Sequence, residues 1–276
     1  MFAHRPRQSE SLSSRYGAGK SSKTSKRSFK EPSNVSLQRA VSGRSPSSFK
    51  SHTSPPVGQT SGSTLTSAII TICVGPDQRL FAGHEDVLSR SPYFAAACRN
   101  QFYDSSSRRI NLPDEAPEVL SAILEYLYKG DYQPVLVHNK AKDTWELDES
   151  ANGEDTIWHH AVKQPILKDT AIYCAASRYS LPDMQRLALR KQGLRCNVQI
   201  STILASARWA YEHTPDTDAK LRAHYLSLII RSRGTFKRSG TMKTEMEKGG
   251  VIFFDLFVAM CNHMDDLQTV RSPYHR

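Results

Sequence analysis

The positive charge of this 276-residue sequence is concentrated at one end, and this divides the chain into a part that can fold and a part that cannot. Residues 1–66 contain eleven lysines and arginines but only two acidic residues, so they carry +9 of the formal net charge of +10. The stretch is rich in serine, is interrupted by proline and glycine, and has no regular apolar spacing. Such a composition cannot bury enough apolar surface to offset the loss of chain entropy. We therefore predict a disordered basic tail over residues 1–66.

The cysteines and the apolar segments indicate where such a protein works. Five cysteines are scattered singly, with no C-x-x-C pair, which is typical of buried thiols in a reducing compartment. The most apolar window, residues 251–260, is too short to cross a bilayer and contains Asp255. The tail has no apolar core of a secretory signal, and its prolines interrupt the amphipathic helix of a transit peptide. We expect an intracellular protein of the nucleus, the cytoplasm or both, without a membrane partner.

Residues 68–130 alternate between strand and helix patterns. The β-branched run "AIITICVG" predicts a buried strand that ends at Gly75-Pro76, and "RLFAG" predicts its hairpin partner. Helical spacing over 84–99 follows, with Ser91 as the cap and Pro92 in the first turn of a second short helix. "RRINL" at 108–112 predicts another strand. The clearest helix covers 117–129, because apolar residues recur at helical spacing and Gly130 occupies the capping position.

The remainder is predicted to be a long loop followed by helices. From about 133 to 164 the sequence is polar and contains Asn152-Gly153, so we interpret it as a surface loop or insertion. Helical spacing returns in "ILKDTAIYCAASRYSL" and in "PDMQRLALRKQGL". Three further helices are predicted over 199–212, over 215–231 with Thr214 as cap, and over about 245–264, the last from the spacing of Phe253, Phe257, Met260 and Met264.

No group of residues assembles a recognisable catalytic motif. His84 is followed by Glu85 and Asp86, which suit the first turn of a helix because acids are stabilised by the positive end of the helix dipole. Cys98 has no histidine at a position that predicts an activated thiol. His159 and His160 are adjacent and therefore point apart, so we expect surface histidines without bound metal. Phosphate-binding glycine motifs and nucleophile elbows are missing from the sequence. We expect a non-enzymatic chain with no catalytic residues, cofactor or metal.

Read together, these segments resemble the BTB/POZ domain in its fungal form. The resemblance rests on "IITICVG", on "FAGHEDVLSRSPYFAAAC", on the combination of "INLPDE" with "LEYLYKGDY", and on "AIYCAASRYSLPDMQRLAL" for a closing helix pair. It implies an α+β fold in which helices flank a small three-stranded sheet. The domain would cover 67–196, with the insertion at about 133–164, and an all-helical extension would cover 197–276. His84, Ser91, Pro92 and Phe94 would be its structural signature.

The resemblance also implies a function as a protein–protein interaction module. Family members self-associate, recruit a cullin scaffold for ubiquitin ligation, or bind transcriptional corepressors. Where the family often has an aspartate in the opening strand this chain has Ala68, and where a lysine or arginine often follows the histidine it has Glu85. Those positions line the groove of the repressor-type members, so the departures favour another use of the domain.

A cullin adaptor is the best-specified hypothesis. Cullin-binding members place an apolar residue two positions before an acid after the third helix, and Phe102-Tyr103-Asp104 matches this with aspartate in place of glutamate. The alternative is that Phe102 packs in the core and Asp104 begins a turn. A rival function is a nuclear regulatory protein that self-associates through the domain and contacts nucleic acid through its basic tail. Phosphate contacts would make that binding fall steeply with salt, but the tail has few aromatic residues among its basic ones, so a nucleic-acid partner is the less expected of the two.

Overall fold

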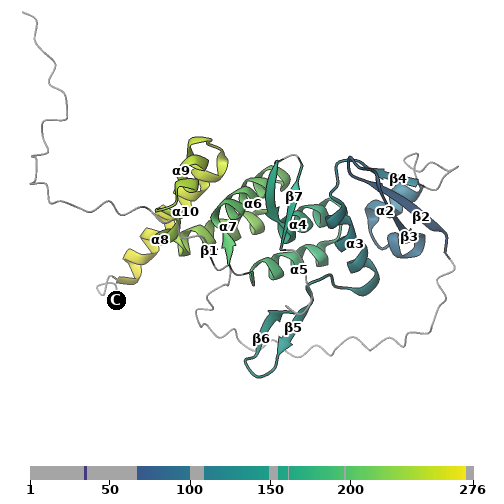
Figure 1. The fold of residues 1–276 in the computed structure, drawn as a ribbon. Helices are drawn as coiled ribbons and strands as arrows, with labels where there is room; N and C mark the ends of the chain where they lie inside the picture. The colour runs from purple at the N-terminus through teal and green to yellow at the C-terminus, as the bar shows by residue number, and fades with distance from the viewer. Residues whose placement is uncertain are drawn as a thin grey trace, which may run out of the picture. The chain divides into compact units, whose positions relative to one another are not determined.

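The computed structural model describes residues 34–35, 67–99, 109–148, 155–160, 162–195 and 197–271, and all structural statements below concern these ranges (Figure 1). Most of the predicted disordered tail lies outside them. Asn34–Val35 is the exception, because these two residues form a short strand, β1.

The first folded layer is a three-stranded sheet. Strands β2 (Ile69–Val74), β3 (Arg79–His84) and β4 (Arg109–Leu112) are arranged in the order β3-β2-β4. β2 pairs antiparallel with β3 and parallel with β4. The turn between β2 and β3 begins at Gly75, whose φ of 73° is unfavourable for any residue with a Cβ. The predicted strands and the predicted hairpin are confirmed.

Five helices flank and extend this sheet at the positions that the sequence predicts. They are α1 (Glu85–Leu88), α2 (Pro92–Arg99), α3 (Pro117–Lys129), α4 (Lys168–Arg178) and α5 (Pro182–Gln192). Three of them begin at a proline, which suits the first turn because it lacks an N–H. Helix α3 ends at Gly130, which has a left-handed φ of 80° and donates its N–H to the Tyr126 carbonyl.

Substitution of Leu124 with alanine tests the assignment of the buried face of α3. Leu124 belongs to the core and is only 8% exposed. Truncation of a buried leucine removes transfer free energy and leaves a cavity, which together cost about 2–5 kcal/mol. We expect Leu124→Ala to lower the free energy of unfolding toward the lower end of that range, measured by urea denaturation. A loss below about 0.5 kcal/mol would contradict the assigned face, since ordinary surface changes stay within that limit.

The described part of residues 133–164, which were predicted to be a surface loop or insertion, is not a loop, because it forms two β-hairpins. Strand β5 (Leu136–Asn139) pairs with β6 (Thr144–Leu147), and β7 (Thr156–His159) pairs with β8 (Gln164–Leu167). The turns use Asp143 and Lys163 at positive φ instead of glycine, so they carry no strong turn signal. Most side chains of β5 and β6 are exposed, which explains why no apolar alternation predicts them.

The extension after residue 196 is helical with one exception. Strand β9 (Val198–Gln199) pairs antiparallel with β1, so the prediction of an all-helical extension is corrected. It is followed by α6 (Ile200–His213), α7 (Ala219–Arg231), α8 (Arg233–Phe236), α9 (Gly240–Glu247) and α10 (Val251–Arg271). None of these described helices is both long and apolar enough to cross a membrane.

Two predicted boundaries in the extension are also corrected. Helix α7 begins four residues later than predicted, because Asp218, and not Thr214, caps it by accepting the Lys220 N–H. The helix predicted over 245–264 is two helices, separated at Gly249-Gly250, where both glycines have positive φ. Phe257, Met260 and Met264, on which that helix was predicted, are exposed. The buried side of α10 is instead formed by Ile252 and Leu256.

The buried core continues from the sheet and α3 through α4 and α5 into the extension. Helix α6 packs against both α4 and β8. Hydrogen bonds cross the same boundary: the Leu167 N–H donates to Ser206 Oγ at 2.8 Å, and the Tyr173 hydroxyl donates to the Asp218 carboxylate at 2.8 Å. The extension is therefore joined to β8 and α4 by packing and by hydrogen bonds.

Candidate functional site

His84 is a structural residue that joins the sheet to α3. It ends β3 and occupies the N-cap position of α1. Its backbone N–H donates to the Tyr128 hydroxyl at 2.9 Å, and its Nδ1 lies 2.7 Å from the same oxygen. Tyr128 lies in the last turn of α3, so these bonds fix α3 against the end of β3. Nothing in this geometry activates a nucleophile.

The acids after His84 act on the helix start, as the sequence predicts. Glu85 and Asp86 lie in the first turn of α1. The Ser67 hydroxyl donates to Asp86 Oδ1 at 2.5 Å and is the main reason that the pKa of Asp86 is lowered. Burial raises the pKa of the Cys98 thiol, with Glu85 adding to the effect, so the reactive thiolate is disfavoured there.

Ser91, Pro92 and Phe94 clamp α2 onto the end of α4. The Ser91 hydroxyl donates to the Tyr179 carbonyl at 2.7 Å and accepts the Phe94 N–H at 3.3 Å, so it caps α2 while holding the residue after α4. Pro92 is the first residue of α2. The Phe94 ring is fully buried and stacks on the Tyr179 ring at 5.0 Å. The Tyr179 hydroxyl in turn donates to Glu115 Oε2 at 2.6 Å.

Two sets of residues from the sequence analysis remain, namely the proposed cullin contact and the adjacent histidines. Phe102, Tyr103 and Asp104 lie outside the described residues. His159 is not a surface histidine as predicted, because its ring lies 3.9 Å from that of Trp209 in α6, and His213 stacks on the same Trp209 ring. Burial lowers the pKa of His159. Among the described residues, no group of three His, Cys, Asp or Glu side chains is placed to hold a metal ion.

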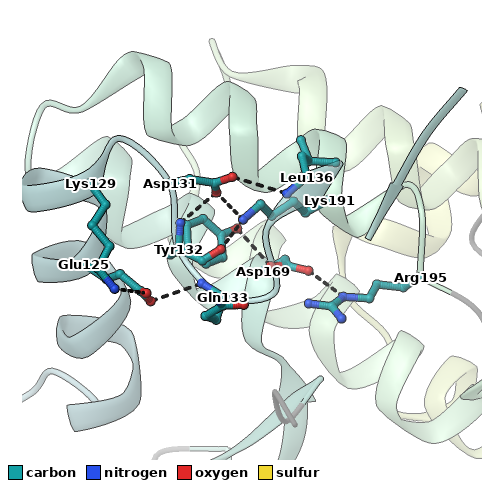
Figure 2. Close-up of polar contacts among 9 residues, drawn as sticks. All are labelled: Glu125, Lys129, Asp131, Tyr132, Gln133, Leu136, Asp169, Lys191 and Arg195. Carbon is teal, nitrogen blue, oxygen red and sulfur yellow. Dashed lines mark hydrogen bonds and ion pairs between the residues drawn. The ribbon is translucent and has the colours of Figure 1, made fainter. Parts of the chain in front are cut away.

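A buried polar network that the sequence did not reveal connects α3, α4 and α5 (Figure 2). We call it the α3–α5 network. It comprises Asp131, Tyr132, Asp169, Lys191 and Arg195. The Lys191 ammonium donates to Asp131 Oδ1 and to the Tyr132 carbonyl, and it lies 3.6 Å from the centroid of the Tyr132 ring.

The second half of the α3–α5 network is centred on Asp169. Its carboxylate accepts the Tyr132 hydroxyl at 2.9 Å and Arg195 Nε at 2.8 Å, and it is fully buried. Burial, followed by the charge of Asp169, raises the pKa of Tyr132 well above its usual value, so the phenol remains a donor. Burial lowers the pKa of Lys191, an effect that Asp131 opposes. Every charge is paired, which is the condition under which buried charges are tolerated.

The α3–α5 network is placed for a structural role. Its members lie just after α3, in α4, and at or just after the end of α5, and they hold the closing helix pair against the end of α3. The one signal in the sequence was "KGDY", in which the helix-ending Gly130 is followed by Asp131 and Tyr132. Nothing in the spacing of α5 indicates that Lys191 points inward.

The described residues thus form a small mixed sheet flanked by helices, in which His84, Ser91 and the α3–α5 network make structural contacts. Residues 69–147 match the family model of the BTB/POZ domain. The chain thus carries a BTB/POZ domain, a protein–protein interaction module, as the resemblance implied.

The chain is similar to the solved BTB (Tramtrack and Bric a brac) domain of human gigaxonin, with 17% sequence identity. The match covers 44% of this chain and 74% of that one, with a TM-score of 0.28. No curated protein matches the sequence.

Proposed function

We propose that this chain is a non-enzymatic adaptor, in which the BTB/POZ domain binds one protein and the helices after residue 197 hold a second. The observation that carries the proposal is the continuous core between the two parts. Besides the bonds of Ser206 and Asp218, the hydroxyls of Thr170 and Tyr225 lie 2.6 Å apart in the buried boundary. An adaptor joined in this way holds its two partners at a fixed distance and orientation, which a flexible linker could not do.

The partner that we propose for the BTB/POZ domain is a cullin scaffold, contacted by Phe102, Tyr103 and Asp104. The support is the sequence match to an apolar residue followed two positions later by an acid. In such a contact Phe102 supplies the apolar anchor, and anchors carry most of the binding energy of an interface. Asp104 supplies a charge at the rim, which mainly tunes association. The chain would then act as a substrate adaptor of a ubiquitin ligase.

Binding isotherms of full-length variants with a purified cullin test this proposal. We expect Asp104→Lys to weaken binding and Phe102→Ala to weaken it more, because the anchor contributes more than the rim charge. Melting curves of both variants should match the wild type. Asp77→Lys is a matched control, since it reverses an exposed charge in the β2–β3 turn.

The outcomes separate the two roles of Phe102. If Phe102 belongs to the core, Phe102→Ala lowers stability by about 3–5 kcal/mol, the cost of removing a buried phenylalanine. Cullin binding that is unchanged in both variants, or missing in the wild type, would reject the cullin proposal while leaving the adaptor proposal to be tested with other scaffolds.

A further inference from the structure

Helix α10 has an apolar face that no described residue covers. Val251 is 65% exposed, Phe254 68%, Phe257 65% and Met264 51%. The helix itself is well anchored, because Ile252 and Leu256 on its other side are buried and it packs on α6 and α7. The Tyr211 hydroxyl also donates to Asp255 Oδ2 at 3.0 Å. A fixed helix therefore presents its aromatic side chains to solvent.

The exposed residues follow the spacing of a helix–helix seam. Phe254, Phe257, Cys261 and Met264 are separated by three, four and three residues. This is the a/d spacing of the heptad repeat, which places a continuous apolar stripe along one side of a helix. Val258, Met260 and Leu267 are also exposed and flank the stripe. The pattern fits a second helix better than a flat or irregular surface.

The size of the face also requires a partner. The two phenylalanines alone present on the order of 250 Å² of exposed surface, since a whole aromatic side chain offers about 150–250 Å². Monomers rarely expose a contiguous apolar patch larger than a few hundred Å². A stable interface buries about 800 Å² from each partner. The two phenylalanines supply about a third of that area, and exposed Val258, Met260 and Met264 of α10 add to it.

The order of the exposed residues identifies the partner as a second copy of the same helix. The exposed positions are symmetric about Ala259: Val251 corresponds to Leu267, Phe254 to Met264, and Val258 to Met260. Half-exposed Cys261 corresponds in the same way to Phe257. When two such helices run antiparallel about a two-fold axis at the level of Ala259, Phe254 faces Met264 and Phe257 faces Cys261 of the other copy, with Val258 and Met260 at the edges of the seam. Self-complementarity of this kind is the requirement for a two-fold homodimer.

Charge favours the antiparallel arrangement over the parallel one. Asp255, Asp265 and Asp266 are the acidic residues of α10, and none belongs to the symmetric apolar set. The partial charges at the helix ends favour the antiparallel pair, because it places the positive N-terminus of each helix beside the negative C-terminus of the other.

We propose that α10 is a dimerisation helix, which pairs antiparallel with α10 of a second copy about a two-fold axis at the level of Ala259 along the helix. This surface lies outside residues 69–147 of the BTB/POZ domain and does not depend on a cullin partner. A dimer formed there would give the adaptor two copies of each binding surface.

Sedimentation velocity of the full chain over a range of concentrations tests the proposal. We expect the wild type to dimerise, and Phe254→Lys and Met264→Glu each to weaken the dimer by about tenfold or more, as expected for a charge placed in an apolar seam (tenfold corresponds to about 1.4 kcal/mol). Because residue 254 faces residue 264 of the other copy, an equimolar mixture of the two variants should recover dimerisation. The double variant should recover it as well.

Asn262→Lys is the matched control, since Asn262 is exposed on α10 outside the apolar set and its substitution introduces the same charge. It should leave the dimer unchanged, and melting curves should show that all variants stay folded. A monomeric wild type, or a dimer that persists at wild-type strength in Phe254→Lys and Met264→Glu, would overturn the proposal. Weakened single variants without recovery in the mixture would overturn the antiparallel register.

Discussion

Substitution of Asp169 with alanine should lower the free energy of unfolding by about 3–5 kcal/mol, the range for breaking a buried ion pair from one side. The carboxylate of Asp169 accepts Arg195 Nε and the Tyr132 hydroxyl in a fully buried environment. Without it, the nearly buried Arg195 guanidinium keeps only Asp155, which is half exposed, and the Tyr132 phenol loses its acceptor. Urea denaturation monitored by circular dichroism would measure the loss.

Two matched variants test whether the loss of stability in Asp169→Ala comes from the burial of this carboxylate. Asp155→Ala removes the other partner of Arg195 from a side chain that is 49% exposed, so it should cost no more than about 1 kcal/mol. Asp169→Asn keeps the shape and can still accept one hydrogen bond, so its loss should lie between the two. Equal losses in Asp155→Ala and Asp169→Ala would show that the α3–α5 network does not depend on the buried carboxylate.

The sequence predicts the elements of this domain well where the signals are local. Pro117 and Gly130 mark both ends of α3, and Pro182 marks the start of α5, because proline and glycine each have one strong conformational preference at these positions. The β-branched run of β2 is buried by the helices around it, so its pattern is strong. These local signals, in their order, also carried the resemblance to the BTB/POZ family.

Features that depend on distant partners could not be predicted in this way. The hairpin β5–β6 exposes most of its side chains, so it shows no alternation of apolar and polar residues. In β7–β8 the buried residues Ile157, Ile166 and Leu167 are too few and too irregularly spaced to predict two strands. His159 is covered by Trp209, which lies fifty residues later in the sequence. Helical spacing cannot tell which side of a helix finds a partner, so it predicted α10 from the residues that remain exposed.

One missed boundary did have a signal. Gly249-Gly250 interrupts the predicted helix over 245–264, and two adjacent glycines favour a break because each raises the entropic cost of helix formation. The α3–α5 network had no comparable signal, since lysines and arginines near the end of a helix are ordinarily exposed and favourable there. His84 and Ser91 lie next to helix starts and could be identified from the sequence, whereas Asp169 could not, because its partners Tyr132 and Arg195 are distant in the sequence.

Phe94→Ala is the other variant for which we expect a large effect, a loss of about 3–5 kcal/mol in the free energy of unfolding. Phe94 is fully buried and stacks on Tyr179 with an interplanar angle of 22°, so its removal leaves a cavity between α2 and the end of α4. The neighbouring Tyr93 packs edge-on against the same Tyr179 ring but is 37% exposed, so Tyr93→Ala should cost much less and serves as the control. Thermal and urea melts of both variants would measure the difference. Similar losses for Phe94→Ala and Tyr93→Ala would mean that the Ser-Pro-x-Phe segment does not clamp α2 to α4 through its phenylalanine.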